Sequence, residues 1–237
     1  MLKQSMKVSS NMIGSVAMDK LSLLMIIISN PLEKKYLDLL QKYKVKFKAL
    51  THGMGTASSS LLDYFGLNEA ERIVIFSVMP KIVSKHILRY AKSKLKIDEP
   101  GKGIALTIPL SSSTKYMQEI YKNQKLEDFE MKEVSQHLII TIVNEGFAEM
   151  VMNAAKKAGS RGGTTINGRG LETEKIIKFL GIAIEPEKDI VLILTDEEKK
   201  TPIMNEIVEA CGIKTPGAGI CFSIPVENVV GLNMIEN

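Results

Sequence analysis

PGKGIALTIPL, at residues 100–110, recurs as PGAGICFSIPV at residues 216–226. Both stretches follow the pattern P-G-x-G-I-x-x-[ST]-I-P-[LV], which contains six identities at one separation. Self-similarity at a fixed separation is typical of a duplicated structural unit. The sequence therefore predicts two copies of one domain, at residues 20–112 and 135–237, joined by a linker at residues 113–134.

Other landmarks repeat at nearly the same separation. Gly53-Met54-Gly55 matches Gly168-Arg169-Gly170, and Arg72-Ile73-Val74-Ile75 matches Asp189-Ile190-Val191-Leu192. Together with the long match, these landmarks place the same succession of loops and strands in both halves.

Hydrophobic periodicity and turn residues predict the elements of each half. The first half is expected to contain strands at 23–29, 45–50, 73–79 and 104–110, with helices beginning at Pro31 and at Pro80. The second half is expected to contain strands at 138–143, 164–167, 190–195 and 220–226, with helices at 146–158 and 201–211. The last helix would carry Pro202 in its first turn. This βαββαβ order predicts an α+β chain of two tandem ferredoxin-like domains, each with an antiparallel sheet and both helices on one face.

The other face of each predicted sheet has no helix to cover it. A domain of about 90 residues buries only somewhat over 60% of its unfolded surface and is marginal alone. The open face is therefore expected to pack against another copy, either between the two halves or between chains. A homo-oligomer is the expected state.

Composition excludes several classes of protein. The 237 residues carry a formal net charge of +4 with no concentrated basic stripe, so nucleic-acid binding is not expected. The apolar run at Leu21–Ile28 is too short to span a bilayer, and it is interpreted as a buried strand rather than a membrane segment. Cys211 and Cys221 form no CxxC pair, which predicts reduced thiols, no zinc site and a cytoplasmic protein.

The order of elements and the glycine motifs resemble the PII nitrogen-regulatory superfamily. The stronger match runs through Ala158-Gly159-Ser160-Arg161-Gly162-Gly163-Thr164 to Gly168-Arg169-Gly170. The resemblance implies a signalling protein that forms a trimer, binds an adenine nucleotide or small anionic effector between domains, and controls a partner protein through its loops. Nitrogen regulation is carried over from the family, and the sequence identifies neither the effector nor the partner.

The residues implied in ligand binding are glycines with neighbouring basic residues. Glycine lets a backbone approach a ligand closely, and arginine can donate paired hydrogen bonds to an anion. They are Arg161, Gly162, Gly163, Gly168, Arg169, Gly170, Gly217, Ala218 and Gly219 in the second half, and Gly53, Gly55, Gly101, Lys102 and Gly103 in the first.

The sequence departs from the family at the phosphate-binding cations. PII proteins carry a lysine after the second glycine of the final loop, where this chain has Ile104 and Ile220. The arginines that follow the last strand are also missing, since Val229–Met234 contains no positive charge. These losses put an adenine-nucleotide cofactor in doubt.

Alternative interpretations remain open. The glycine loops are equally typical of tight turns and of close backbone packing, so the chain can be an interaction module whose ligand site is lost. An enzyme is not expected, because no catalytic or metal-ligating constellation is recognisable. A fold alone does not decide among these functions.

Overall fold

The structure is a computed structural model that describes residues 21–56, 70–122, 126–131, 134–170, 177–179, 182–184 and 187–232. The first half contains β1 (Leu21–Ser29), the 3-10 helix η2 (Asn30–Leu32), α1 (Glu33–Lys42), β2 (Phe47–Gly55), β3 (Ala70–Pro80), α3 (Lys81–Ser93) and β4 (Gly103–Pro109), and α4 (Lys115–Tyr121) follows in the linker. The second half contains β5 (Gln136–Asn144), α5 (Ala148–Lys157), β6 (Thr164–Arg169), the short pair β7 (Ile177–Phe179) and β8 (Ile182–Ile184), β9 (Glu187–Asp196), α6 (Glu197–Cys211), β10 (Ile220–Val226) and β11 (Asn228–Val230).

The principal strands and helices confirm the predicted βαββαβ order in both halves, with one displaced helix start. Helix α6 begins at Glu197, so Pro202 lies inside the helix and not in its first turn as expected. Asp196 occupies the N-cap position, and Glu197 and Glu198 lie in the first turn. Acidic residues at this end interact favourably with the helix dipole, which explains the earlier start.

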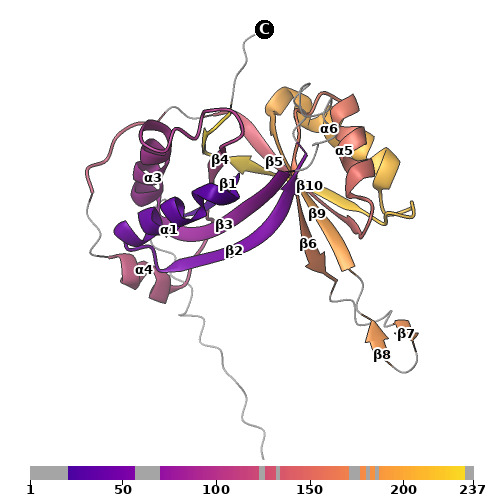
Figure 1. Ribbon diagram of the computed structural model, residues 1–237, viewed down its shortest axis with the longest axis horizontal. Coiled ribbons are helices and arrows are strands. Elements are labelled where there is room, and N and C mark those ends of the chain that lie inside the picture. Colours follow the sequence, from indigo (N-terminus) through magenta and orange to yellow (C-terminus); the bar gives the residue numbers. More distant parts are fainter. Residues whose placement is uncertain are drawn as a thin grey trace, which may run out of the picture.

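A single nine-stranded sheet replaces the two separate sheets that the sequence predicted. Its strand order is β10-β5-β9-β6-β2-β3-β1-β4-β11, and all of its pairings are antiparallel. The halves join where β2 pairs with β6, through Met54 opposite Thr165 and Gly55 opposite Thr164. Figure 1 shows these two strands meeting near the centre of the molecule and then diverging.

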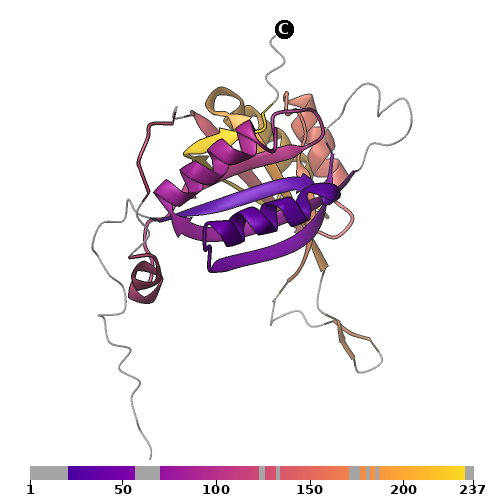
Figure 2. The ribbon, with the colours of Figure 1, turned by 60° about the vertical axis from the view of Figure 1, so that its left-hand side comes forward.

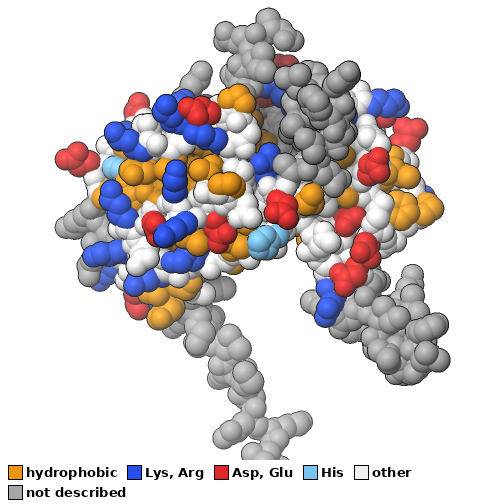
Figure 3. All heavy atoms as spheres, viewed as in Figure 1, with side chains coloured by type: hydrophobic (Ala, Val, Ile, Leu, Met, Phe, Trp, Pro, Cys, Tyr) orange, Lys and Arg blue, Asp and Glu red, His pale blue; other side chains and the backbone are white. Residues whose placement is uncertain are grey.

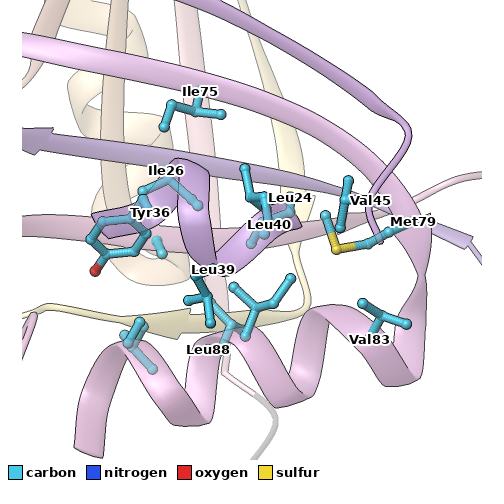
Figure 4. Close-up of a cluster of buried hydrophobic side chains, with 14 of the residues drawn as sticks. Leu24, Ile26, Tyr36, Leu39, Leu40, Val45, Ile75, Met79, Val83 and Leu88 are labelled. Carbon is cyan, nitrogen blue, oxygen red and sulfur yellow. The ribbon is translucent and has the colours of Figure 1, made fainter. Parts of the chain in front are cut away.

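The helices cover the outer faces of the sheet. In Figure 1, α1 and α3 lie on the left and α5 and α6 on the right, with the strands between them. Figure 2 shows α1 and α3 side by side against the strands of the first half. Beneath them, Leu24 and Ile26 of β1 pack with Leu40 of α1 and Leu88 of α3, and all four side chains are fully buried (Figure 4).

The inner faces of the two halves cover each other. One hydrophobic cluster draws on both halves, with Met25, Ile27, Val74, Leu106 and Ile108 from the first and Leu138, Ile166, Leu192 and Val226 from the second. Burying such a side chain contributes about 1.5–3 kcal/mol relative to leaving it exposed. The face that was expected to need another copy is therefore covered within one chain, and a trimer stays a prediction.

A short strand absent from the sequence prediction ties the halves together a second time. After β10 the backbone N–H of Glu227 donates to the carbonyl of Thr107 at 2.9 Å. Strand β11 then pairs with β4 of the first half, with Val229 opposite Leu106. The second half thus supplies the last strand beside the first half.

The linker packs against the first half. The Tyr121 hydroxyl at the end of α4 donates to the Val78 carbonyl at 2.9 Å. Further along, the guanidinium of Arg89 stacks on the ring of Phe129, 3.0 Å from its centroid. No helix within the described residues has the length and apolar character that crossing a membrane requires. Positive and negative side chains are mixed over the face shown in Figure 3.

Candidate effector site

The glycines at the end of β2 lie at the junction between the halves. A side chain at Gly53 would meet the carbonyl oxygen of Thr165 at 2.7 Å and the side chain of Ile166 at 2.8 Å. Gly55 is buried and lies opposite Thr164 in the β2–β6 ladder. The small size of Gly53 therefore serves the close approach of the second half.

Gly162 and Gly163 meet the same junction from the second half. The backbone N–H of Thr56 donates to the carbonyl of Gly163 at 2.9 Å, and the N–H of Gly163 donates to the Thr56 hydroxyl at 3.1 Å. A side chain at Gly163 would meet the carbonyl of Leu192 at 2.8 Å. The neighbouring Arg161 is exposed. The alternative interpretation, that glycine permits close backbone packing, is thus supported at Gly163.

The first-half loop at Gly101–Gly103 packs against the end of β1. Gly101 and Gly103 have φ angles of +78° and +138°, which favour glycine. A side chain at Gly103 would meet the Cα of Ile28 at 2.8 Å. Arg72 of β3 is half-buried and donates from Nη1 to the Gly101 carbonyl at 3.2 Å.

The end of β11 covers this first-half loop. The N–H of Gly231 donates to the carboxylate of Asp98 at 2.6 Å, and Gly231 lies against the backbone of Gly103. Lys102 forms an ion pair with Glu99 at 2.6 Å. Lys102, the basic residue predicted for ligand binding in this loop, is therefore already paired with Glu99. The backbone of the loop next to it is covered by Gly231.

The second-half loop is fastened to the end of β5. The backbone N–H of Asn144 donates to the Gly217 carbonyl at 2.9 Å, and its side-chain amide donates to the Pro216 carbonyl at 2.9 Å. Ala218 is exposed with a φ of +44°, whereas Gly217 and Gly219 are buried. A side chain at Gly219 would meet that of Val143 at 2.8 Å, so packing requires this glycine as well.

Lys188 links this loop to the neighbouring strands. It lies opposite Asn144 in the β5–β9 ladder and opposite Gly168 in the β6–β9 ladder. Its Nζ donates to the Asn144 Oδ1 at 2.9 Å, and Asn144 in turn holds the Pro216 carbonyl. Lys188 is half-buried on the inner face, because it shares a face with Ile190, which packs against the shared core.

The first half has the same arrangement, and sequence reasoning missed it. Arg72 lies opposite Ser29 on one side and Gly53 on the other. The ladders therefore match Arg72 with Lys188, not with Asp189 as the sequence comparison proposed. A basic residue just before the apolar run of the third strand in each half is the signal that could have identified both positions.

Arg169 lies at the same end of the sheet but on its other face. It is exposed and lies opposite Glu187 in the β6–β9 ladder. Side chains alternate along a strand, so Arg169 shares the outer face with α5 and α6, whereas Gly168 faces inward beside Lys188. Gly170 follows directly and is half-buried. Ligand binding by these three residues stays a prediction.

A separate cavity of about 290 Å³ lies at the start of α3 and contains none of the predicted site residues. Its lining is mixed in charge, because Lys81 pairs with Glu227 and Lys85 pairs with Asp128 at 3.0 Å just outside it. The lining residues are Lys81, Lys85, Glu130, Met131, Glu227 and Asn228.

Metal and thiol chemistry have little geometric support. Within the parts of the chain that the structure describes, no three His, Cys, Asp or Glu side chains gather as ligands of one ion. Burial raises the pKa of the Cys211 thiol and of the Cys221 thiol, which disfavours the reactive thiolate.

A solved protein structure is similar to part of this chain. No family model and no curated protein matches the chain. The crystal structure of Arabidopsis thaliana PII bound to citrate is similar over 39% of this chain and 75% of that chain, with 22% sequence identity and a TM-score of 0.30.

Proposed function

We propose that the chain is a non-catalytic regulatory protein that binds a small anionic effector at the strand ends of its second half. One observation carries this proposal: Lys188 lies opposite Gly168 and is joined through Asn144 to the Pro216–Gly219 loop. The half-buried ammonium of Lys188 is a suitable partner for a carboxylate or phosphate oxygen, because Gly168 has no side chain that would block the approach of the anion. Control of a partner protein through the segments after β2 and β6 belongs to the same proposal; between β6 and β9 the structure describes Gly170, β7 and β8, and residues 57–69 after β2 lie outside the described residues.

The hydrogen bonding of the loop favours a small anion over a nucleotide. A phosphate cradle needs successive backbone N–H groups that point at the ligand. Here the N–H of Ala218 donates to the Thr215 carbonyl at 3.0 Å, and the N–H of Gly219 donates to the Cys211 carbonyl at 2.8 Å. These donors are already used, so the affinity for an anion would rest on basic side chains.

The second half is the better site because the first-half loop is covered. Gly231 lies against Gly103, and the carboxylates of Asp98 and Glu99 are close to the position that an anion would need. In the second half, Ala218 and Arg169 are exposed and Lys188 is half-buried. An effector on the inner face would therefore meet the Lys188 ammonium next to Gly168, whereas Arg169 and the Glu187 carboxylate opposite it lie on the outer face.

An interaction module without an effector is the second candidate. It is favoured by Gly53, Gly163 and Gly219, because a side chain at any of them would meet protein atoms at 2.8 Å or less. In this interpretation the glycines allow close packing between and within the halves, and the basic residues only keep the protein in solution.

A thermal-shift screen of the full chain separates the two candidates. The panel contains inorganic phosphate, citrate, 2-oxoglutarate, bicarbonate, ADP and ATP, with sodium chloride at matched ionic strength to control for charge screening. A ligand at 100 times its dissociation constant adds about 2.7 kcal/mol to the unfolding free energy. We expect at least one small anion to raise the melting temperature beyond the salt control. A panel without any such shift at millimolar concentration would favour the interaction module.

A further inference from the structure

Strand β10 is the last strand of the sheet at the end formed by the second half. Its counterpart β4 has β1 on one side and β11 on the other, whereas β10 pairs only with β5 among the residues that the structure describes. An unpaired edge presents backbone donors and acceptors that can pair with another chain. Edges of this kind are usually protected by charged residues, but Ile220–Val226 contains none.

Apolar side chains surround this edge. Ile220 is 49% exposed and Phe222 is 40% exposed on β10, and Val208 and Ile213 at the end of α6 are 52% and 71% exposed. The bridge between Gly212 and Gly219 brings the end of α6 beside the start of β10. Figure 3 shows hydrophobic side chains reaching the surface on the right, over the end of α6. These four residues, called here the β10 edge patch, flank the edge strand on both sides. Ile220 and Phe222 share the inner face with Ile224, whereas Val208 and Ile213 lie on the helix side.

The direction of the backbone groups follows from two observations. Asn144 of β5 donates its N–H toward the β10 side, to Gly217. In an antiparallel ladder such residues alternate, so the even-numbered residues of β10 bond to β5 and the odd-numbered residues point outward. Pro225 agrees with this assignment, since a proline within a strand is tolerated where no ladder N–H is needed. The outward N–H donors of β10 are therefore those of Cys221 and Ser223.

We propose that β10 pairs antiparallel with β10 of a second copy of this chain, around a two-fold axis at Phe222. In this register Cys221 lies opposite the partner's Ser223, and Ser223 lies opposite the partner's Cys221. Each pair exchanges two backbone hydrogen bonds. Phe222 then faces the partner's Phe222 at a position without backbone bonds, where side chains approach each other most closely.

The properties of the strand point to a second copy rather than to an unrelated peptide. A two-fold interface needs one surface that is complementary to itself. The β10 edge patch is apolar and uncharged, so two copies meet without repulsion. The register centred on Phe222 uses the outward N–H and C=O groups of both Cys221 and Ser223, whereas centring on Ser223 would leave the carbonyl of Cys221 facing the partner's Pro225, which has no N–H to donate. This inference does not depend on the proposed effector site.

Light scattering of the full chain across 1–100 µM tests the interface. We expect a dimer whose mass falls to that of a monomer in Phe222→Lys, because the variant places two like charges at the axis. Phe222 is exposed, so the variant should keep its fold, which circular dichroism checks. Met150→Lys is the matched control, since Met150 is 47% exposed on α5 away from β10, and it should remain dimeric. A wild-type monomer at 100 µM, a trimer, or a Phe222→Lys variant that stays dimeric would overturn the proposal.

Disulfide trapping tests the register. Facing residues without backbone bonds have Cα atoms about 4.5 Å apart, within the range that a disulfide spans. In a Cys221→Ser background, Phe222→Cys should give a covalent dimer on mild oxidation. Ile220→Cys is the control, because its partner in this register is Ile224 of the partner subunit and not its own copy. Equal cross-linking of the two variants, or none at Phe222→Cys, would contradict the register.

Discussion

Arg72 and Lys188 occupy the same position in the two halves of the sheet. Each is the basic residue that lies opposite a glycine of the neighbouring strand, Gly53 for Arg72 and Gly168 for Lys188. Arg72 donates a hydrogen bond directly to the Gly101 carbonyl in the loop of the first half. Lys188 donates to Asn144, which in turn donates to the Pro216 carbonyl in the loop of the second half. The duplicated unit thus keeps one arrangement, which Gly231 covers in the first half.

Replacement of Arg169 tests the basic residue that the sequence favoured most. A hydrogen bond to a charged group contributes about 1.5–3 kcal/mol. Arg169 lies on the outer face, so it can contribute such a bond only by reaching round the end of β6. In that arrangement Arg169→Ala should weaken binding of the best anion from the screen by about 10-fold or more, measured by calorimetric titration. The melting temperature without ligand should hardly change, because Arg169 is exposed. Unchanged affinity would remove Arg169 from the site.

The equivalent glycines Gly53 and Gly168 should differ in their tolerance of alanine. At Gly53 the new methyl would meet the backbone carbonyl of Thr165 at 2.7 Å, whereas at Gly168 it would meet the end of the flexible Ile190 side chain at 3.1 Å. Overpacking against backbone costs about 1–3 kcal/mol. Urea unfolding should show that loss for Gly53→Ala and less than about 1 kcal/mol for Gly168→Ala. Equal losses would mean that the junction of the halves is looser than described.

Tyr36 should make the protein less stable at alkaline pH. Burial, and then the nearby Asp98 carboxylate, raise the pKa of Tyr36 well above its ordinary value of 10.0. The folded state therefore resists ionisation, and stability that is present below pH 10 is lost as the pH rises above it. Tyr36→Phe should lose less stability between pH 9 and pH 11 than the wild type does, measured by urea unfolding at each pH.

The same variant has an expected effect at neutral pH. The Tyr36 hydroxyl is buried and has no hydrogen-bond partner among the described residues. Leaving a polar group unsatisfied costs about 1–3 kcal/mol, so Tyr36→Phe should be neutral or more stable by about 1 kcal/mol at pH 7. A loss of more than 1 kcal/mol would show that the hydroxyl has a partner after all.

The strands and helices could be predicted from sequence because apolar runs such as Leu23–Ser29 determine local structure. The pairing of β2 with β6 could not be predicted, because nothing in the sequence around Met54 and Thr165 indicates that these two residues face each other. Strand β11 was missed because Asn228–Val230 is too short for a periodicity. At the site, glycine motifs located the loops correctly, but a match displaced by one residue hid Lys188, and only the ladder register corrects it.

Calorimetric titration of the wild type, Lys188→Met and Arg72→Met with the best anion of the screen tests the proposed effector site most directly. Methionine keeps a long apolar side chain and removes the charge in both variants. Lys188→Met should bind about 10-fold more weakly or worse, since it loses a charged hydrogen bond. Arg72→Met should bind as the wild type does, even where loss of its bond to Gly101 lowers the melting temperature. Equal affinity of Lys188→Met and the wild type, or a greater loss in Arg72→Met, would contradict an effector site in the second half.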